Sequence, residues 1–200
     1  MCIRDRLNSA VFYDDYSDIQ RSIVIIDTTT LTTGTLVTNA AKARLQGFES
    51  ELNIKATDAL TLSGTVGYLD GTYKSFVDLT GDRSGERFPF PDWSYTVSGR
   101  YVIPMPLGEF SLQADWRWQS SQNLAPAAKN ISQVTQPSFG LLNARVALDI
   151  PDQQMTLAVF GKNILDEKYL VNVLSLEAIG YNRGGTGEPF TFGVEFSKNF

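Results

Sequence analysis

The 200-residue sequence contains no histidine and only one cysteine, Cys2. The lack of histidine excludes Ser-His-Asp catalysis, Cys-His catalysis and histidine-rich zinc sites. A single cysteine excludes an internal disulfide and a multi-cysteine metal site. The carboxylates, including the neighbours Asp14 and Asp15, show no arrangement typical of carboxylate-pair chemistry. We therefore expect neither an enzyme nor a bound cofactor or metal.

Basic residues are in the minority. The sequence has 17 Lys and Arg against 22 Asp and Glu, a formal net charge of −5. Nucleic-acid binding depends on clustered basic side chains that neutralise phosphates. The charge balance therefore predicts that nucleic acid is not a partner.

Long apolar runs are missing as well. No stretch approaches the roughly 20 apolar residues of a transmembrane helix, and residues 1–10 lack the apolar core of a secretory signal. Residues 1–5, Met-Cys-Ile-Arg-Asp, match the translation of a transposon-end adapter used in sequencing libraries. We therefore expect residues 1–6 to be non-native and the protein's own sequence to begin near Leu7, inside a longer protein. An ordinary short N-terminus is the alternative.

What the sequence does contain is a strict alternation of apolar and polar residues. Over residues 109–120, one set of alternate positions is Phe110, Leu112, Ala114, Trp116 and Trp118, and the other is Ser111, Gln113, Asp115, Arg117 and Gln119. Period two is the pattern of a β-strand, whose successive side chains point to opposite faces. The same pattern covers residues 60–68, 93–103, 141–150 and 190–200, and we expect further strands near 7–17, 41–56 and 154–169. The total is eight strands.

The connections between these strands alternate in length. Short links are expected at residues 57–59, 104–108 and 151–153, and long polar links at about 18–38, 75–90, 120–137 and 171–187. Short turns at one end and long loops at the other are typical of a transmembrane antiparallel β-barrel built as an up-and-down meander. Strands of ten or more residues also suit a tilted bilayer crossing. We therefore predict an all-β fold of this kind.

The two faces of the strands differ in chemistry. The apolar face carries aromatic residues near the expected strand ends, as in the girdles of membrane barrels: Tyr95, Tyr101, Trp116, Trp118, Phe196 and Phe200. The polar face carries charges that suit a hydrated lumen, namely Arg100, Arg117, Arg145, Asp115 and Asp149. A soluble carbohydrate-binding β-sandwich has the same alternation, with the apolar face buried inside. It remains the alternative at this point.

Three motifs resemble those of one protein family, the TonB-dependent outer-membrane receptors. Residues 39–52 resemble a strand toward the C-terminal end of their barrel, residues 161–169 resemble the penultimate strand, and residues 189–200 resemble the terminal strand. The matching positions are Asn39, Lys42, Ala43, Arg44, Gly47, Glu49, Asn163, Asp166, Tyr169, Pro189 and Gly193, followed by the terminal Phe200. Ala41, Leu165 and Phe190 depart from the usual residues, which leaves the subfamily open. From the residues alone, we expect the Asn163–Tyr169 motif to form a strand-end turn.

The resemblance implies a 22-stranded barrel in the outer membrane of a Gram-negative bacterium, closed by an N-terminal plug domain that the TonB complex moves. Residues 7–200 would then form about the last eight strands, with the plug domain absent. The implied function is TonB-energised uptake of a scarce large solute such as a siderophore, cobalamin or saccharide. Other implied partners are outer-membrane lipid and the barrel assembly machinery, which would read Phe196 and Phe200. A complete eight-stranded barrel with an anchoring or adhesion role is the second alternative.

Candidate ligand contacts lie in the last two long links. They are Tyr181, Asn182 and Arg183 in one link, and Gln122, Asn123 and Lys129 in the other. Long loops of a rigid scaffold are where binding residues concentrate. Solvated loop surface is the alternative interpretation of all six residues.

Overall fold

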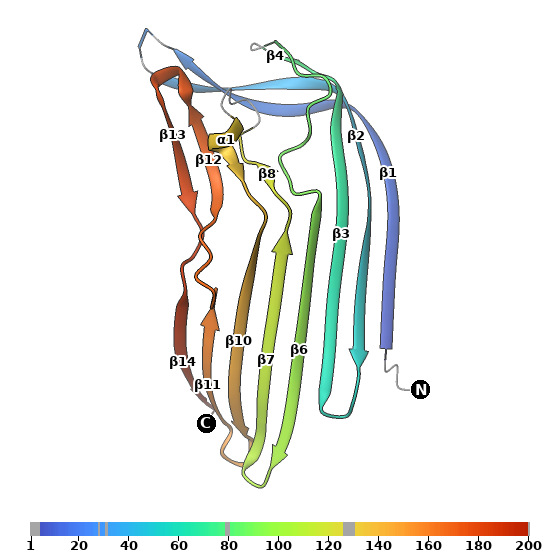
Figure 1. Cartoon of the computed structure of the whole chain (residues 1–200), viewed down its shortest axis with the longest axis vertical. Coiled ribbons are helices and arrows are strands. Elements are labelled where there is room, and N and C mark those ends of the chain that lie inside the picture. The colour runs from blue at the N-terminus through green and yellow to red at the C-terminus, as the bar shows by residue number, and fades with distance from the viewer. Residues whose placement is uncertain (1–4, 28, 31, 79–80, 126–130, 200) are drawn as a thin grey trace.

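The structure is a computed structural model, and it describes residues 5–27, 29–30, 32–78, 81–125 and 131–199. Eight long strands form one antiparallel sheet in which each strand pairs with the next long strand in the chain (Figure 1). These are β1 (Asp5–Asp27), β2 (Thr32–Lys55), β3 (Leu60–Ser75), β6 (Trp93–Met105), β7 (Gly108–Gln119), β10 (Phe139–Ile150), β11 (Met155–Lys162) and β14 (Thr191–Lys198). β1 and β14 are the two edges of the sheet. The all-β antiparallel meander predicted from the sequence is confirmed.

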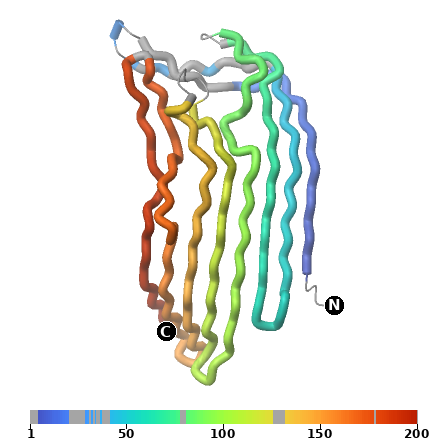
Figure 2. The backbone as a smooth tube through the Cα atoms, viewed as in Figure 1, coloured from blue at the N-terminus to red at the C-terminus, as the bar shows by residue number. Residues whose placement is uncertain are grey.

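The two ends of the sheet differ, as the tube in Figure 2 shows. One end has short turns between β2 and β3, between β6 and β7, and between β10 and β11, where η1 (Pro151–Gln153) lies. The other end has longer connections with their own small elements. These elements are β4 (Val77–Asp78), β5 (Gly81–Asp82), β8 (Gln122–Asn123), α1 (Ile131–Val134), β9 (Thr135–Gln136), β12 (Leu170–Leu176), η2 (Glu177–Ile179) and β13 (Tyr181–Thr186). Among the described residues, no helix has the length and apolar content that crossing a membrane requires.

Two strand predictions need correction. The link expected at residues 18–38 is largely strand, because β1 and β2 stay paired as far as Asp27 and Thr32. Ile and Val at positions 23–26 and the threonines of β2 favour extended backbone, and this outweighs the loop signal from Thr, Gly and Asn. The strand expected at 154–169 ends at Lys162, because Asn163 and Asp166 adopt positive φ angles of 46° and 51°.

The register of the sheet places the predicted apolar set on one face. Residues directly opposite each other on paired strands share a face. Val146 lies opposite Leu112 on β7 and Val159 on β11, and Val159 lies opposite Val194 on β14. These side chains are exposed, from 39% for Val146 to 75% for Val194. Soluble proteins rarely expose an apolar patch that spans several strands.

The sheet itself has no packed core on either face among the described residues. The other sheets in the described part of the chain have two strands each, which is too small to form the second layer of a sandwich. A cluster of buried apolar residues lies at the long-loop end, where Ala43, Tyr73 and Phe76 pack with Ile19 and Phe88. The sheet therefore forms a single-layered wall, and the long-loop end is the packed part of the molecule.

Candidate functional site

The candidate site is the long-loop end of the sheet, which we call the loop end and define as the described residues of 69–93, 119–139 and 163–190. Three connections meet there: the β3–β6 connection, the β7–β10 connection and the β11–β14 connection. Each is fixed by a different set of hydrogen bonds. All the predicted ligand contacts fall on the second and third connections.

The β3–β6 connection runs back along the upper part of β3. Three backbone N–H groups donate across it: Tyr73 to the Glu86 carbonyl (2.9 Å), Gly85 to the Tyr73 carbonyl (2.7 Å) and Phe88 to the Gly71 carbonyl (2.9 Å). Gly71 makes this close approach feasible, since a Cβ there would lie 2.6 Å from Phe90 Cζ and 2.9 Å from Phe88 Cδ2. The rings of Phe88 and Phe90 therefore lie directly against the β3 backbone.

Ion pairs fix the same connection. The buried Arg83 donates to both carboxylate oxygens of Glu86, at 2.9 and 2.7 Å. Arg87 donates to Asp92 at 2.7 Å and to Asp70 on β3 at 3.2 Å. Partial burial by itself would lower the pKa of Arg87, but the two carboxylates outweigh it and raise that pKa. Both guanidinium groups are thus held in place by carboxylates.

The β7–β10 connection starts beside the β3–β6 connection. The Ser120 N–H donates to the Trp93 carbonyl at 2.9 Å, and the Trp93 N–H donates to the Ser120 hydroxyl at 3.1 Å. β8 then pairs with β9, and the Leu124 N–H donates to the Val134 carbonyl. The result is a groove of about 320 Å³ between the two connections, lined by Glu86, Arg87, Phe88, Phe90, Asp92, Ser121, Gln122 and Asn123.

The β11–β14 connection is fixed at its base by Asn163, whose side chain is 3% exposed. The Asn163 amide NH₂ donates to the carbonyls of Glu167 and Glu188, and its oxygen accepts from the Glu167 N–H, all at 2.9 Å. The Asn163 N–H donates to the Asn143 side-chain oxygen on β10, and Asn143 donates in turn to Asp115 on β7. Asn163 therefore links both ends of the β12–β13 hairpin, through its side chain, to β10 of the wall, through its backbone N–H.

Two neighbours complete this base. Asp166 accepts a hydrogen bond from the Phe190 N–H at 3.0 Å. The Tyr169 ring stacks on Phe139 with centroids 4.5 Å apart, and it covers Gly187, where a Cβ would lie 2.0 Å from the ring. Asn163, Asp166 and Tyr169 thus hold the turn that follows β11.

The second and third connections are also bonded to each other. The Leu170 N–H donates to the Gln136 side chain at 2.6 Å, and the Asn182 amide donates to the Gln133 side chain at 2.9 Å. Asn182 also accepts from the Leu176 N–H at 3.2 Å. The β12–β13 hairpin is therefore tied to α1 and β9.

The structure separates the predicted ligand contacts into three groups. Tyr181 and Arg183 are exposed on β13, whereas Asn182 is engaged in hydrogen bonds within the loop end. Gln122 and Asn123 line the groove. Lys129 lies outside the described residues. Sequence reasoning missed Arg87 and the two phenylalanines of the groove, although their run, Arg-Phe-Pro-Phe-Pro-Asp at 87–92, combines aromatic, charged and rigid residues.

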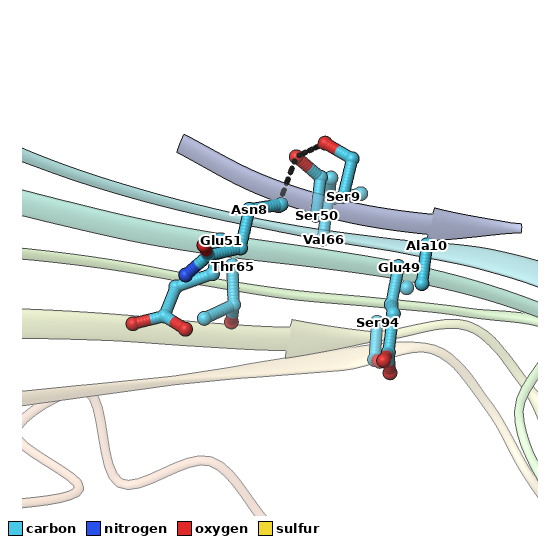
Figure 3. A pocket seen from close by; sticks show the side chains of 10 residues that line it. Asn8, Ser9, Ala10, Glu49, Ser50, Glu51, Thr65, Val66 and Ser94 are labelled. Carbon is cyan, nitrogen blue, oxygen red and sulfur yellow. Dashed lines mark hydrogen bonds between the residues drawn. The ribbon is translucent and has the colours of Figure 1, made fainter. Parts of the chain in front are cut away.

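The β2 motif residues line the wall. Figure 3 shows a second groove on the polar face, where Glu49 and Glu51 of β2 point to the same side as Thr65 and Ser94, opposite to Ser9 and Ser50. A Cβ on Gly47 would lie 2.1 Å from the Tyr68 carbonyl oxygen. Two of the remaining motif residues make side-chain contacts: Ala43 is buried in the core cluster, and Arg44 pairs with Asp15 at 3.3 Å. Lys42 is exposed beside a register shift, and Asn39 lies opposite Gln20 on β1.

The terminal strand belongs to the wall. Phe196 is exposed on the apolar face opposite Leu157, and Gly193 lies against the Phe160 ring on the polar face. Arg145 pairs with Glu195 at 3.2 Å across β11, whereas Asp115 accepts from the Asn143 amide and Asp149 accepts from the Thr156 hydroxyl. Pro189 is exposed before the strand, and Phe200 lies outside the described residues.

The groups at the loop end suit non-covalent binding. Among the described residues, no three His, Cys, Asp or Glu side chains come together in a way that could hold a metal ion. Arg87, Asn123 and Asn182 are held by hydrogen bonds, which suits recognition of a ligand by complementary contacts.

Comparison with known proteins shows what the whole chain is similar to. The family model described as TonB dependent receptor-like, beta-barrel matches residues 4–164. The ferric yersiniabactin uptake receptor FyuA from Yersinia pestis superposes with a TM-score of 0.78 at 17% identity, covering 100% of this chain and 28% of that one. The copper transporter OprC gives 0.73 at 17%, covering 98% and 29%. The ferric-catecholate import receptor Fiu from E. coli K12 gives 0.67 at 20%, covering 96% and 24%.

Proposed function

Because the chain belongs to the TonB-dependent receptor-like β-barrel family, we propose that it forms part of the barrel wall of an outer-membrane receptor for energised solute uptake. Members of this family are receptors and transporters of the Gram-negative outer membrane, not enzymes. The chain spans about a quarter of the length of the solved structures it matches.

The observation that carries this proposal is the single-layered wall with an exposed apolar face. In a bilayer this face contacts lipid, and the opposite face, with Glu49, Asp115 and Arg145, faces a hydrated lumen. Backbone groups at a free strand edge cannot remain unpaired in lipid. The edges β1 and β14 therefore pair with further strands, and we propose that residues 7–200 are the last eight strands of a 22-stranded barrel whose plug domain lies elsewhere in the protein.

The loop end then lies outside the cell and captures the solute. The solute class is a siderophore, cobalamin, a saccharide or another scarce large molecule, and the TonB complex supplies energy through the plug. The matched solved structures include a ferric yersiniabactin uptake receptor, a siderophore receptor and a copper transporter, which supports uptake in general. We also propose that the aromatic end of β14, Phe196 with Phe200, is read by the barrel assembly machinery.

The test uses the full-length receptor that contains this segment, expressed in cells with and without TonB. We expect a heat-modifiable barrel in the outer membrane in both strains, and solute accumulation in the TonB-containing strain alone. Uptake that is equal in both strains would overturn the proposal. Refolding of the 200-residue chain alone into a monodisperse detergent-soluble monomer, with β1 paired to β14, would instead support a complete eight-stranded barrel.

A further inference from the structure

We propose that the groove between residues 86–92 and β8 binds a neutral, polyhydroxylated ligand, namely a segment of an oligosaccharide. The groove is lined on one side by Phe88 and Phe90 and on the other by Ser121, Gln122 and Asn123. This inference rests on the proposed receptor function and names the class of solute that the loop end would capture.

The first argument is that the groove is preformed. Backbone hydrogen bonds anchor its first wall to β3 at Tyr73 and Gly71. The paired bonds between Ser120 and Trp93, and the bond from the Ala125 N–H to the Asn123 side-chain oxygen at 3.0 Å, anchor its second wall. A rigid site loses little conformational entropy on binding, which matters most for a weakly interacting neutral ligand.

The second argument is the charge balance of the groove. Its charged lining residues are Glu86, Arg87 and Asp92, and each already has an ion-pair partner: Glu86 pairs with Arg83, and Arg87 pairs with Asp92 and Asp70. The group contains three carboxylates and two guanidinium groups, so one negative charge is left over. An anionic ligand would therefore meet a net repulsion and would have to displace a carboxylate from Arg87.

The third argument is the combination of flat apolar and planar polar side chains. The ring faces of a sugar expose C–H groups, which pack on an aromatic ring, and its hydroxyls are both donors and acceptors. Phe88 and Phe90, whose rings lie edge to face with centroids 5.6 Å apart, supply the apolar contact. The amides of Gln122 and Asn123 and the Ser121 hydroxyl supply both donors and acceptors.

The experiment uses the detergent-solubilised full-length receptor on an array of neutral oligosaccharides built from α- and β-linked glucose, mannose, galactose and xylose. We expect binding to at least one type of linkage. Phe90→Leu keeps an apolar side chain but removes the flat ring, so it should raise the Kd about ten-fold. Phe90→Tyr keeps the ring and should stay near the wild-type value. Gln122→Ala should weaken binding by a smaller factor.

Leu165→Ala is the matched control, since Leu165 is an apolar residue, 58% exposed, in the turn after β11. It should leave the Kd unchanged. No binding anywhere on the array overturns the inference, and so does equal loss in the Leu and Tyr variants. Binding of the anionic tris-catecholate complex of ferric iron that depends on Phe90 also overturns it. In each case TonB-dependent uptake and the heat-modifiable barrel would still report separately on the proposed receptor function.

Discussion

The wall and the loop end of this molecule are stabilised in different ways. In the wall, backbone hydrogen bonds between neighbouring strands provide the order, and the side chains of the apolar face point into the surroundings. At the loop end, side chains add to the backbone hydrogen bonds: Asn163 and Gln136 bond to backbone groups, and Arg87 pairs with Asp92. The stability of the wall therefore depends on the medium that surrounds its apolar face, whereas the structure of the loop end depends on particular side chains.

The two regions should therefore tolerate substitutions to different degrees. If the apolar face contacts lipid as proposed, any apolar residue of moderate size suits its positions, because lipid tails adapt to the side chain. A hydrogen-bonded amide such as Asn163 has few substitutes, because its donors and acceptor meet three backbone groups in fixed directions. The loop end is thus where one receptor can differ from another in its ligand while the wall stays the same.

The largest expected effect is a charge placed on the apolar face of the wall. Val146→Arg in the full-length receptor should destabilise the barrel by about 2–4 kcal/mol, because the guanidinium would lie in hydrocarbon. The measurement is denaturant unfolding in phospholipid vesicles. Val171→Arg on β12 is the matched control, since Val171 is 52% exposed at the loop end. It should change stability by less than about 0.5 kcal/mol, and equal losses would remove the distinction between the two regions.

A smaller effect is expected where two strands of the wall approach closely. Gly47→Ala places a methyl group 2.1 Å from the Tyr68 carbonyl oxygen, and backbone cannot move aside as a side chain can. The overpacking should cost about 1–3 kcal/mol in the same vesicle assay. Gly64→Ala is the control, because the nearest atom there is the Thr96 carbonyl oxygen at 3.6 Å. Similar behaviour of the two variants would contradict a packing role for Gly47.

At the loop end the effect should be local. Asn163→Ala leaves three backbone groups of Glu167 and Glu188 without their partner, a loss of about 1–3 kcal/mol if water does not replace it. We expect faster hydrogen exchange and protease cleavage within residues 163–190, while the heat-modifiable barrel persists. Asn172→Ala removes one exposed bond, to the Gly185 N–H, and should change little. Global loss of the barrel in Asn163→Ala would show that the two regions are not independent.

The same difference explains what the sequence could and could not predict. Period-two alternation predicted the wall, because the side chains of a strand face two environments in turn, and residues such as Val146 and Asp115 fell on the faces expected. The alternating lengths of the links between these runs predicted that one end carries the long connections. Alternation continues through any extended segment, however, so it could not show that β1 runs on to Asp27 or that β11 stops at Lys162.

The site was harder to predict because its geometry is non-local. Asn163 joins β10 to two points of a hairpin that are about twenty residues apart in the chain, and no local pattern reports such a contact. The groove likewise combines Phe90 with Gln122, from separate connections. In the sequence, only the residue types of Phe90 and Gln122 indicated that they could contact a ligand. The ion pair between Arg145 and Glu195 was not predicted either, because Glu195 reaches Arg145 across the intervening β11, a contact that register alone does not reveal.

The smallest expected effect is the removal of that ion pair on the polar face. Arg145→Val leaves Glu195 unpaired, but the two side chains are 35% and 47% exposed, so water screens both charges. The cost in unfolding free energy should be about 0–1 kcal/mol, well below that of Val146→Arg at the adjacent position. Glu195→Gln should cost a similar amount, and a loss above 2 kcal/mol in either variant would mean that the polar face is dry.

Spin labels at the same two positions test the faces directly, since neighbours on a strand point in opposite directions. A label at position 146 should be relaxed by oxygen dissolved in the lipid and shielded from a water-soluble nickel reagent. A label at position 145 should show the reverse preference, because it meets the hydrated lumen. Equal shielding of both labels from both reagents would place residue 146 in a protein core, and the apolar face would then pack against protein instead of lipid.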